Sequence, residues 1–413
     1  MNNPHLNDTK VKYVIIMVIY TIVGFVTLRY STEILDYDEL SKYGIYNAIL
    51  YFLYPMTYIG SLGLLRVVYF KGEYIKNKRN LYNVSDTVIS VFSLITLVSI
   101  LTFDFEIDSI FLVLLTCWIR LRKDTLVMEL LSERNIKDWG RVVISFSFFQ
   151  FFLVLSVLNY STTWEARVLC YLLSDVLCLA MYYRWGFFTE IIPFKGTSYF
   201  DISVLKRILF FGIPCVIAVF PAWLNEEADK LIILNYFEDG YFLAAYVASY
   251  GLGMTFNQVI NAYISFYSKD FFESLKVKNR ISSLKSKLIK HNVIINILAM
   301  MFSASIYAFP IVFIPEKYHD FLTITIIIIY SCAILAGSRL VAIFIEYNEQ
   351  TKIKLKISCI GAICNIFFSI LFINKLGVYA PAIGTLISSI VSLIITILLS
   401  AKYDNKISRG IND

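Results

Sequence analysis

The sequence predicts an all-α polytopic membrane protein, with about twelve transmembrane helices in two six-helix lobes around a central cavity. Hydrophobic residues make up 58% of its 413 residues and charged residues only 16%, whereas soluble domains average about 45–50% and about 25%. Apolar runs long enough to cross a hydrocarbon layer of about 30 Å recur from Val14 to Leu399. The polar connections between these runs alternate in charge. These observations argue against a soluble protein with a large core.

Six spans are expected in the N-terminal half. The first, at 11–30, resembles the apolar core of a signal peptide, but no small-residue cleavage pattern follows it, so we expect a retained helix. The next five lie near 43–70, 84–103, 108–131, 140–160 and 165–187. Residues 1–195 form the predicted N-terminal lobe.

Six further spans are expected in the C-terminal half. They lie near 205–234, 240–268, 288–314, 320–346, 352–374 and 376–400. Residues 196–413 form the predicted C-terminal lobe.

A repeated pattern favours this division. ILDY at 34–37 and ILNY at 233–236 each precede a helix start that is rich in aromatic residues. Because six is an even number of spans, the two halves would run in the same direction across the membrane. Chance similarity in a chain rich in Tyr and Ile is the alternative interpretation.

The charge of the connections orients the chain. Basic residues cluster at the N-terminus and in every second connection, as in KNKR at 76–79 and KIKLK at 352–356. The other connections are acidic, as in DYDE at 36–39 and DFEID at 104–108. Cytoplasmic loops are enriched in Lys and Arg, so both termini are expected in the cytoplasm. The net charge of +6 reflects these scattered loops, and no nucleic-acid partner is expected.

Motifs for catalysis are not found. The sequence has no GxxxxGK[ST] phosphate-binding loop and no G-x-S-x-G nucleophile motif. Its seven cysteines lie in apolar segments without a CxxC pair, and it has only three histidines. We therefore expect no metal site, no cofactor and no enzymatic activity, which leaves transport as the favoured function class.

The stretch FPAWLNEEADKLIIL at 220–234 places charged residues inside an apolar span. On a helix, Glu226, Asp229 and Lys230 share one face, and Glu226 precedes Lys230 by four residues, so these two are expected to pair. A charge that faces lipid costs at least about 2.5–3.5 kcal/mol. We therefore expect this face to border a water-filled cavity. The alternative is that the span ends near Trp223 and the charges lie in an extracytoplasmic loop.

Two prolines and several further polar residues fit a pathway through the membrane. Pro214 and Pro221 are expected to kink or break the seventh span. Asp175 stands almost alone in LLSDVLCLA, and Arg120 and Asp124 are spaced to pair. Further polar residues within spans are Arg66, Arg339, Asn257, Gln258 and Asn261. Each alone is equally explained by a hydrogen bond between helices or by snorkelling to the headgroups.

Three segments carry a resemblance to a known family. Residues 205–253 contain a lysine-rich start, FGIP at 211–214, Trp223, Asp229-Lys230 and an aromatic-rich helix with AY at 245–246. This order and spacing resemble the seventh and eighth spans of polysaccharide-unit flippases. Residues 361–394, with Asn365, Gly377, Ala382, Gly384 and Ser388, look like the eleventh and twelfth spans, and KYGIYNAI at 42–49 resembles the start of the second.

The resemblance implies a member of the multidrug/oligosaccharidyl-lipid/polysaccharide exporter superfamily, and within it an O-antigen flippase of the Wzx type. Such a protein carries undecaprenyl-pyrophosphate-linked glycan repeat units across the bacterial inner membrane by alternating access, with coupling to a proton or sodium gradient. Membrane lipids, a glycan polymerase and a chain-length regulator are the implied partners.

The interpretation gives roles to individual residues. The candidates for the substrate pathway are Arg66, Arg120, Lys230, Arg339, Asn257 and Gln258, and those for ion coupling are Asp175, Glu226 and Asp229. Guanidinium groups suit pyrophosphate because they bind it bidentately. The rival interpretations are a small-molecule exporter of the same superfamily, a membrane glycan polymerase and a scaffold for glycan assembly.

Overall fold

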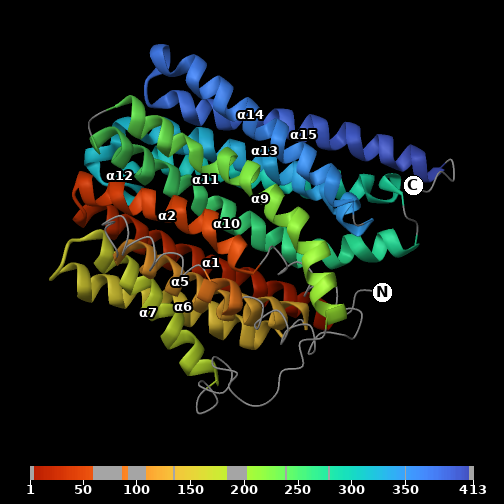
Figure 1. Ribbon diagram of the computed structural model, residues 1–413, viewed down its shortest axis with the longest axis horizontal. Coiled ribbons are helices and arrows are strands. Elements are labelled where there is room, and N and C mark those ends of the chain that lie inside the picture. The colour runs from red at the N-terminus through yellow and green to blue at the C-terminus, as the bar shows by residue number, and fades with distance from the viewer. Residues whose placement is uncertain are drawn as a thin grey trace. The chain divides into compact units, whose positions relative to one another are not determined.

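The computed structural model describes residues 4–58, 86–91, 108–133, 135–183, 202–237, 240–277, 280–348 and 350–408. Within these ranges the secondary structure is helical and contains no strand, which confirms the predicted all-α class (Figure 1). Seven of the described helical stretches are long and apolar enough to cross a membrane. The third predicted span, 84–103, is described only at 86–91, where the chain is helical.

The chain divides into two compact units, one of residues 1–35 and 42–219 and the other of residues 36–41 and 220–413. The predicted lobe boundary after residue 195 lies in 184–201, outside the described residues, and stays a prediction. Below, the two are called the N-terminal unit and the C-terminal unit.

The N-terminal unit is built from α1 (Pro4–Ile34), most of α2 (Tyr37–Thr57), α5 (Asp108–Ser132), α6 (Ile136–Leu158), α7 (Trp164–Tyr183) and the first half of α9 (Ile202–Tyr236). Helix α6 packs against α1 and α7, and α5 contacts both α6 and α7. Helices α2, α5 and α7 share a hydrophobic core. Its buried residues are Tyr46, Leu50, Tyr54, Val113, Cys117, Leu121 and Val168. Inside this core the Tyr46 and Thr116 hydroxyls form a hydrogen bond with each other at 3.0 Å.

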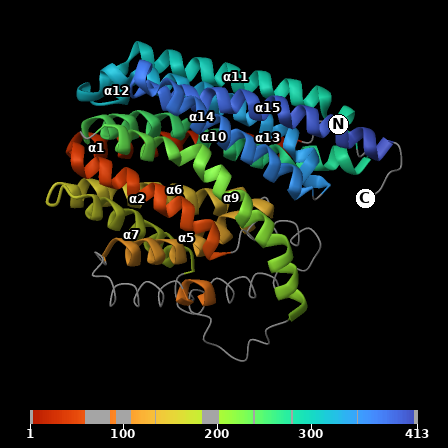
Figure 2. The ribbon, with the colours of Figure 1, turned by 45° about the horizontal axis from the view of Figure 1, so that its top comes forward.

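The C-terminal unit is built from the second half of α9 (Ile202–Tyr236), α10 (Gly240–Val277), α11 (Lys285–Ala308), α13 (Leu322–Tyr347), α14 (Thr351–Leu376) and α15 (Tyr379–Ser408). Short turns at η2 (Ile281–Leu284), α12 (Pro310–Phe313) and η3 (Glu316–Phe321) connect them. Helix α13 packs against α10, α11 and α15, and α15 packs against α14 (Figure 2).

Glycine and serine let α14 and α15 approach closely. A Cβ atom on Gly384 of α15 would lie 2.3 Å from the Ser369 Oγ of α14, and one on Gly361 would lie 2.8 Å from the Ser392 Oγ. Small residues at helix contacts are typical of membrane proteins, because packing replaces the hydrophobic effect in lipid. This close approach places polar groups of both helices beside α9.

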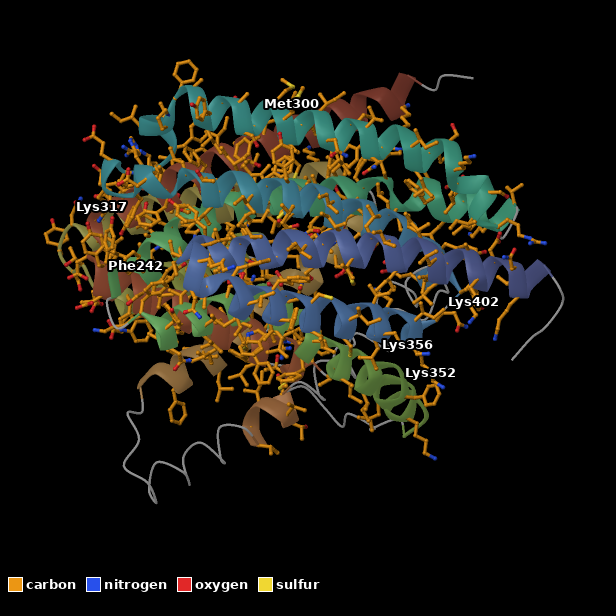
Figure 3. All side chains as sticks on the ribbon, turned by 90° about the horizontal axis from the view of Figure 1, so that it is seen from above. Phe242, Met300, Lys317, Lys352, Lys356 and Lys402 are labelled. Carbon is orange, nitrogen blue, oxygen red and sulfur yellow. The ribbon has the colours of Figure 1, made fainter. Side chains whose placement is uncertain are left out.

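The two ends of the C-terminal unit carry different connections. Lys352, Lys356 and Lys402, which come from connections predicted to be cytoplasmic, lie at one end of its helices (Figure 3). Lys317, from a connection predicted to be extracytoplasmic, lies at the opposite end. This arrangement agrees with the alternation of the predicted spans.

Helices α2 and α9 differ from the predicted spans. Helix α2 begins at Tyr37 rather than at 43, because the Asp36 carboxylate accepts the backbone N–H of Glu39 at 2.8 Å and the acidic first turn suits the positive end of the helix dipole. Helix α9 does not break at Pro214 or Pro221 but continues to Tyr236. Helix α10, at 38 residues, spans about 57 Å and extends well beyond a membrane core.

Candidate functional site

The most enclosed polar site of the C-terminal unit is centred on Asp229 of α9. Its side chain has no exposed surface. The Tyr246 hydroxyl of α10 donates to Oδ2 at 2.6 Å, and the Thr385 hydroxyl of α15 donates to the same oxygen at 2.8 Å. The Asn365 amide of α14 donates to Oδ1 at 3.2 Å. Four helices therefore meet at one carboxylate, and all three donors are neutral.

A second layer of hydrogen bonds holds these donors. Asn365 also donates to the backbone carbonyl of Asn225 at 2.8 Å, and its Oδ1 accepts from the Ser369 hydroxyl at 3.1 Å. The Ser388 hydroxyl bonds to the Asn225 side chain and lies 2.9 Å from the Gly361 carbonyl. The position of Asn365, and so of one donor to Asp229, is set by one contact to α9 and one within α14.

Lys230 forms an ion pair with Glu227, whereas the predicted pair with Glu226 is not tested. Glu227 and Lys230 are both buried, and a buried ammonium is stabilised most by a partner that is desolvated with it. The Lys230 Nζ also lies 5.3 Å from the centre of the Tyr250 ring. The side chain of Glu226 lies outside the described residues.

The surroundings of Asp229 differ from those expected for the charged stretch at 220–234. Residues 225–230 are helical, so the loop alternative is wrong. The predicted water-filled cavity is not what accommodates Asp229 in this conformation, since its carboxylate is satisfied by side chains of its own unit. Both arrangements avoid contact of the charge with lipid.

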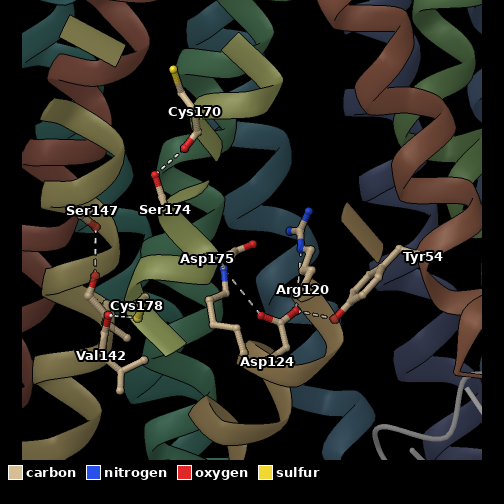
Figure 4. A network of polar contacts seen from close by, with 11 residues as sticks. Tyr54, Arg120, Asp124, Val142, Ser147, Cys170, Ser174, Asp175 and Cys178 are labelled. Atoms are coloured by element: carbon tan, nitrogen blue, oxygen red, sulfur yellow. Dashed lines mark hydrogen bonds and ion pairs between the residues drawn. The ribbon is translucent and has the colours of Figure 1, made fainter. Parts of the chain in front are cut away.

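The N-terminal unit holds a second polar site. The predicted pair of Arg120 and Asp124 on α5 is confirmed, with 3.8 Å between Nε and Oδ2. Tyr54 of α2 donates to the same Asp124 oxygen at 2.6 Å (Figure 4). The Arg120 guanidinium lies 5.2 Å from the Tyr54 ring centre, 5.5 Å from Tyr51 and 5.6 Å from Tyr171. Two rings of α2 and one of α7 stabilise this cation.

Asp175 of α7 lies close to Asp124 in the same site (Figure 4) and is 1% exposed. Sequence reasoning treated it as solitary, but the Lys123 Nζ of α5 lies 2.6 Å from its Oδ1. Lys123 was missed because it lies on another helix, and only tertiary packing brings it to Asp175. The two residues carry opposite charges within predicted spans, and each needs a partner there, so this complementarity is the signal that could have predicted the pair.

Arg339 of α13 joins two of the other predicted residues. Its Nη1 donates to the Asn257 Oδ1 of α10 at 2.8 Å and also to the Asn261 Oδ1. Gln258 is exposed and lies outside this group. Arg66 lies outside the described residues. Within the described part of the chain, no cluster of His, Cys, Asp and Glu side chains would hold a metal ion.

Comparison with known proteins shows the fold of the chain but no family. The sequence matches no family model and no curated protein. An outward-facing multidrug resistance MATE family transporter of the MOP superfamily superposes with a TM-score of 0.68 over 98% of this chain and 97% of that chain, at 13% identity. An inward-facing multidrug resistance MATE family transporter of the same superfamily gives a TM-score of 0.66 over 97% of this chain and 99% of that chain, at 11% identity.

The chain has the fold of the MATE transporters. The Vibrio cholerae MATE transporter VcmN gives a TM-score of 0.64 over 98% of this chain and 97% of that chain, at 11% identity. This fold has twelve helices in two lobes, which confirms the predicted class. The chain is therefore a multi-pass membrane protein, and at such low identity the likeness carries the fold alone.

Proposed function

We propose that the protein is a transporter of the bacterial inner membrane that carries undecaprenyl-pyrophosphate-linked oligosaccharide repeat units by alternating access. The observation that carries the transport class is the likeness along the whole chain to MATE family transporters in an outward-facing and in an inward-facing conformation. The lipid-linked substrate rests on the sequence resemblance at 205–253 and 361–394.

The cationic residues differ in how ready they are to bind pyrophosphate. Arg339 donates to two neutral amide oxygens, which orient its guanidinium. Arg120 keeps 17% of its side chain exposed and is 3.8 Å from its carboxylate, so the pair is loose. Lys230 is buried against Glu227 and is available only if that pair opens. We therefore assign the phosphate contact first to Arg339 and then to Arg120.

Asp229 is the carboxylate best placed for ion coupling. It is buried among neutral donors, and none of the described cationic side chains lies within ion-pairing distance of it. A buried carboxylate without a counter-ion is costly, so uptake of a proton or a sodium ion would relieve that cost. Binding and release of the cation would reorganise the contacts of α9 with α10, α14 and α15. Such a change in helix contacts is what a transport cycle requires.

A reconstituted assay tests the substrate. The full-length protein in proteoliposomes receives a polyprenyl-pyrophosphate oligosaccharide on the inner leaflet, and the sugar exposed outside is measured with a membrane-impermeant glycosidase. We expect exposure to rise with the protein, and to fall severalfold for Arg339→Gln. No gain over empty liposomes, across several glycans and under both proton and sodium gradients, would reject the flippase proposal.

A multidrug exporter is the second candidate, and the described function of the outward-facing structural neighbour favours it. Efflux of a cationic dye from cells that express the protein separates the two candidates. If dye efflux depends on Asp229 while glycan flipping is absent, the exporter is the correct function.

A further inference from the structure

The two units stabilise their buried carboxylates with different kinds of partner. In the C-terminal unit Asp229 faces three neutral donors. In the N-terminal unit Asp175, which is equally buried, faces the ammonium of Lys123 at 2.6 Å. Only one of these carboxylates therefore has a cation supplied by the chain itself.

The surroundings of the Lys123 ammonium are those of a cation site. The ring of Phe146 on α6 has its centre 3.8 Å from Nζ, and the ring of Tyr171 on α7 lies 5.5 Å away. A second carboxylate oxygen, Asp124 Oδ1, lies 4.0 Å away. Aromatic faces and carboxylates attract a small cation together, and the lysine side chain is only 9% exposed. Three helices thus enclose one positive charge.

We propose that Lys123 is a built-in cation that permanently fills a monovalent-cation site formed by Asp175, Asp124, Phe146 and Tyr171, so that the N-terminal unit takes up no free coupling ion. The inference rests on the proposed transport function only where it concerns coupling. It makes Asp175 a positioning residue that ties α7 to α5, and it leaves cation uptake to the C-terminal unit.

Tethering explains why a free ion does not compete. An ammonium attached to α5 meets Asp175 at an effective concentration far above that of dissolved ions, because no translational freedom is lost when the pair forms. The pair is also shielded from solvent, so dissolved salt screens it weakly. Without the ammonium, the same groups form a vacant site with two carboxylates and two rings.

Chemical rescue tests the site itself. Lys123→Ala in the full-length protein, purified in detergent with lipid, is expected to lower the melting temperature. Propylammonium chloride should restore several degrees of the loss in a saturable way, whereas tetraethylammonium, which is too large, should not. The wild-type protein should show no such response. Lys137→Ala, which removes an exposed lysine of α6, is the matched control and should behave as wild type.

A double variant keeps the test decisive if Lys123→Ala folds poorly. Lys123→Met with Asp175→Asn removes both charges, and should be more stable than either single variant and insensitive to propylammonium. A double variant no better than the singles, or a Lys123→Ala protein that ignores every small cation, would overturn the proposal. These stability readouts need no substrate, so they stand apart from failure of the flipping assay.

A binding measurement tests the consequence for coupling. Sodium or proton uptake by the wild-type protein should be abolished by Asp229→Asn and retained at unchanged affinity by the double variant of Lys123 and Asp175. If uptake instead disappears in Asp175→Asn and persists in Asp229→Asn, the N-terminal unit is the one that takes the ion, and the proposal is wrong.

Discussion

The Tyr246 hydroxyl of α10 donates a hydrogen bond of 2.6 Å to the Asp229 carboxylate of α9, inside the C-terminal unit and away from solvent. The Thr385 hydroxyl approaches the same oxygen from α15 at 2.8 Å. Two donors on one oxygen stabilise the charged form of a carboxylate. The packing of α9, α10 and α15 is therefore coupled to the charge on this one group.

Removing the tyrosine hydroxyl should destabilise this unit. Tyr246→Phe keeps the ring but deletes a donor to a charged acceptor, a loss of about 1.5–3 kcal/mol in the free energy of unfolding. Thermal unfolding of the purified protein measures it. Tyr307→Phe, at a ring that is 78% exposed, is the control and should leave stability unchanged. Equal melting temperatures for Tyr246→Phe and wild type would show that the hydrogen bond contributes little.

Neutralising the Asp229 carboxylate should uncouple transport from the ion gradient that drives it. Asp229→Asn is nearly isosteric and keeps one carbonyl oxygen as an acceptor for the Tyr246 and Thr385 hydroxyls. We expect transport in proteoliposomes to lose its dependence on an imposed proton or sodium gradient, while downhill movement continues. Initial rates with and without the gradient measure this. A gradient response of wild-type size in the variant would exclude Asp229 as the coupling group.

The sequence indicated some contacts of the site and not others, for a physical reason. Arg120 and Asp124 were predicted to pair because helix geometry alone places residues four apart on one face. The partner of Asp175 was missed because Lys123 lies on another helix, and only tertiary packing brings them together. Local periodicity predicts contacts within a helix and is silent on contacts between helices.

The same limit applies to Asp229. The sequence marked it as a charge in an apolar stretch, but its donors are Tyr, Thr and Asn residues on three other helices. Neutral polar residues of this kind are common in spans and do not stand out in composition. The early start of α2 was missed because DYDE was interpreted as a loop, whereas acidic residues also favour the first turn of a helix.

Breaking the buried pair in α9 should cost more than removing it. Glu227→Gln leaves the Lys230 ammonium buried without its carboxylate, and a loss of about 3–5 kcal/mol in the free energy of unfolding is expected. Glu227→Gln combined with Lys230→Met should recover most of it, since no buried charge remains unpaired. Thermal unfolding of Glu227→Gln, of Lys230→Met and of the double variant measures the coupling, and strictly additive effects would mean that the two residues do not interact in the folded protein.

The contact between α14 and α15 offers a test that does not involve charge. Gly384→Ala places a Cβ 2.3 Å from the Ser369 Oγ, 2.7 Å from the Asn365 Oδ1 and 2.9 Å from the Asn365 backbone carbonyl. Because that carbonyl belongs to the helix backbone, the two helices must separate, and we expect a loss of about 1–3 kcal/mol in stability. Asn365 would move with α14, so its hydrogen bond to Asp229 should weaken as well.

Gly24→Ala is the matched control, because a Cβ there meets nothing within 4 Å inside α1. The added methyl group should raise the free energy of unfolding by up to about 1 kcal/mol, since alanine favours a helix interior over glycine. Melting temperatures of both variants should therefore shift in opposite directions from that of wild type. If Gly384→Ala is as stable as Gly24→Ala, the close approach of α14 and α15 does not position the donors of Asp229.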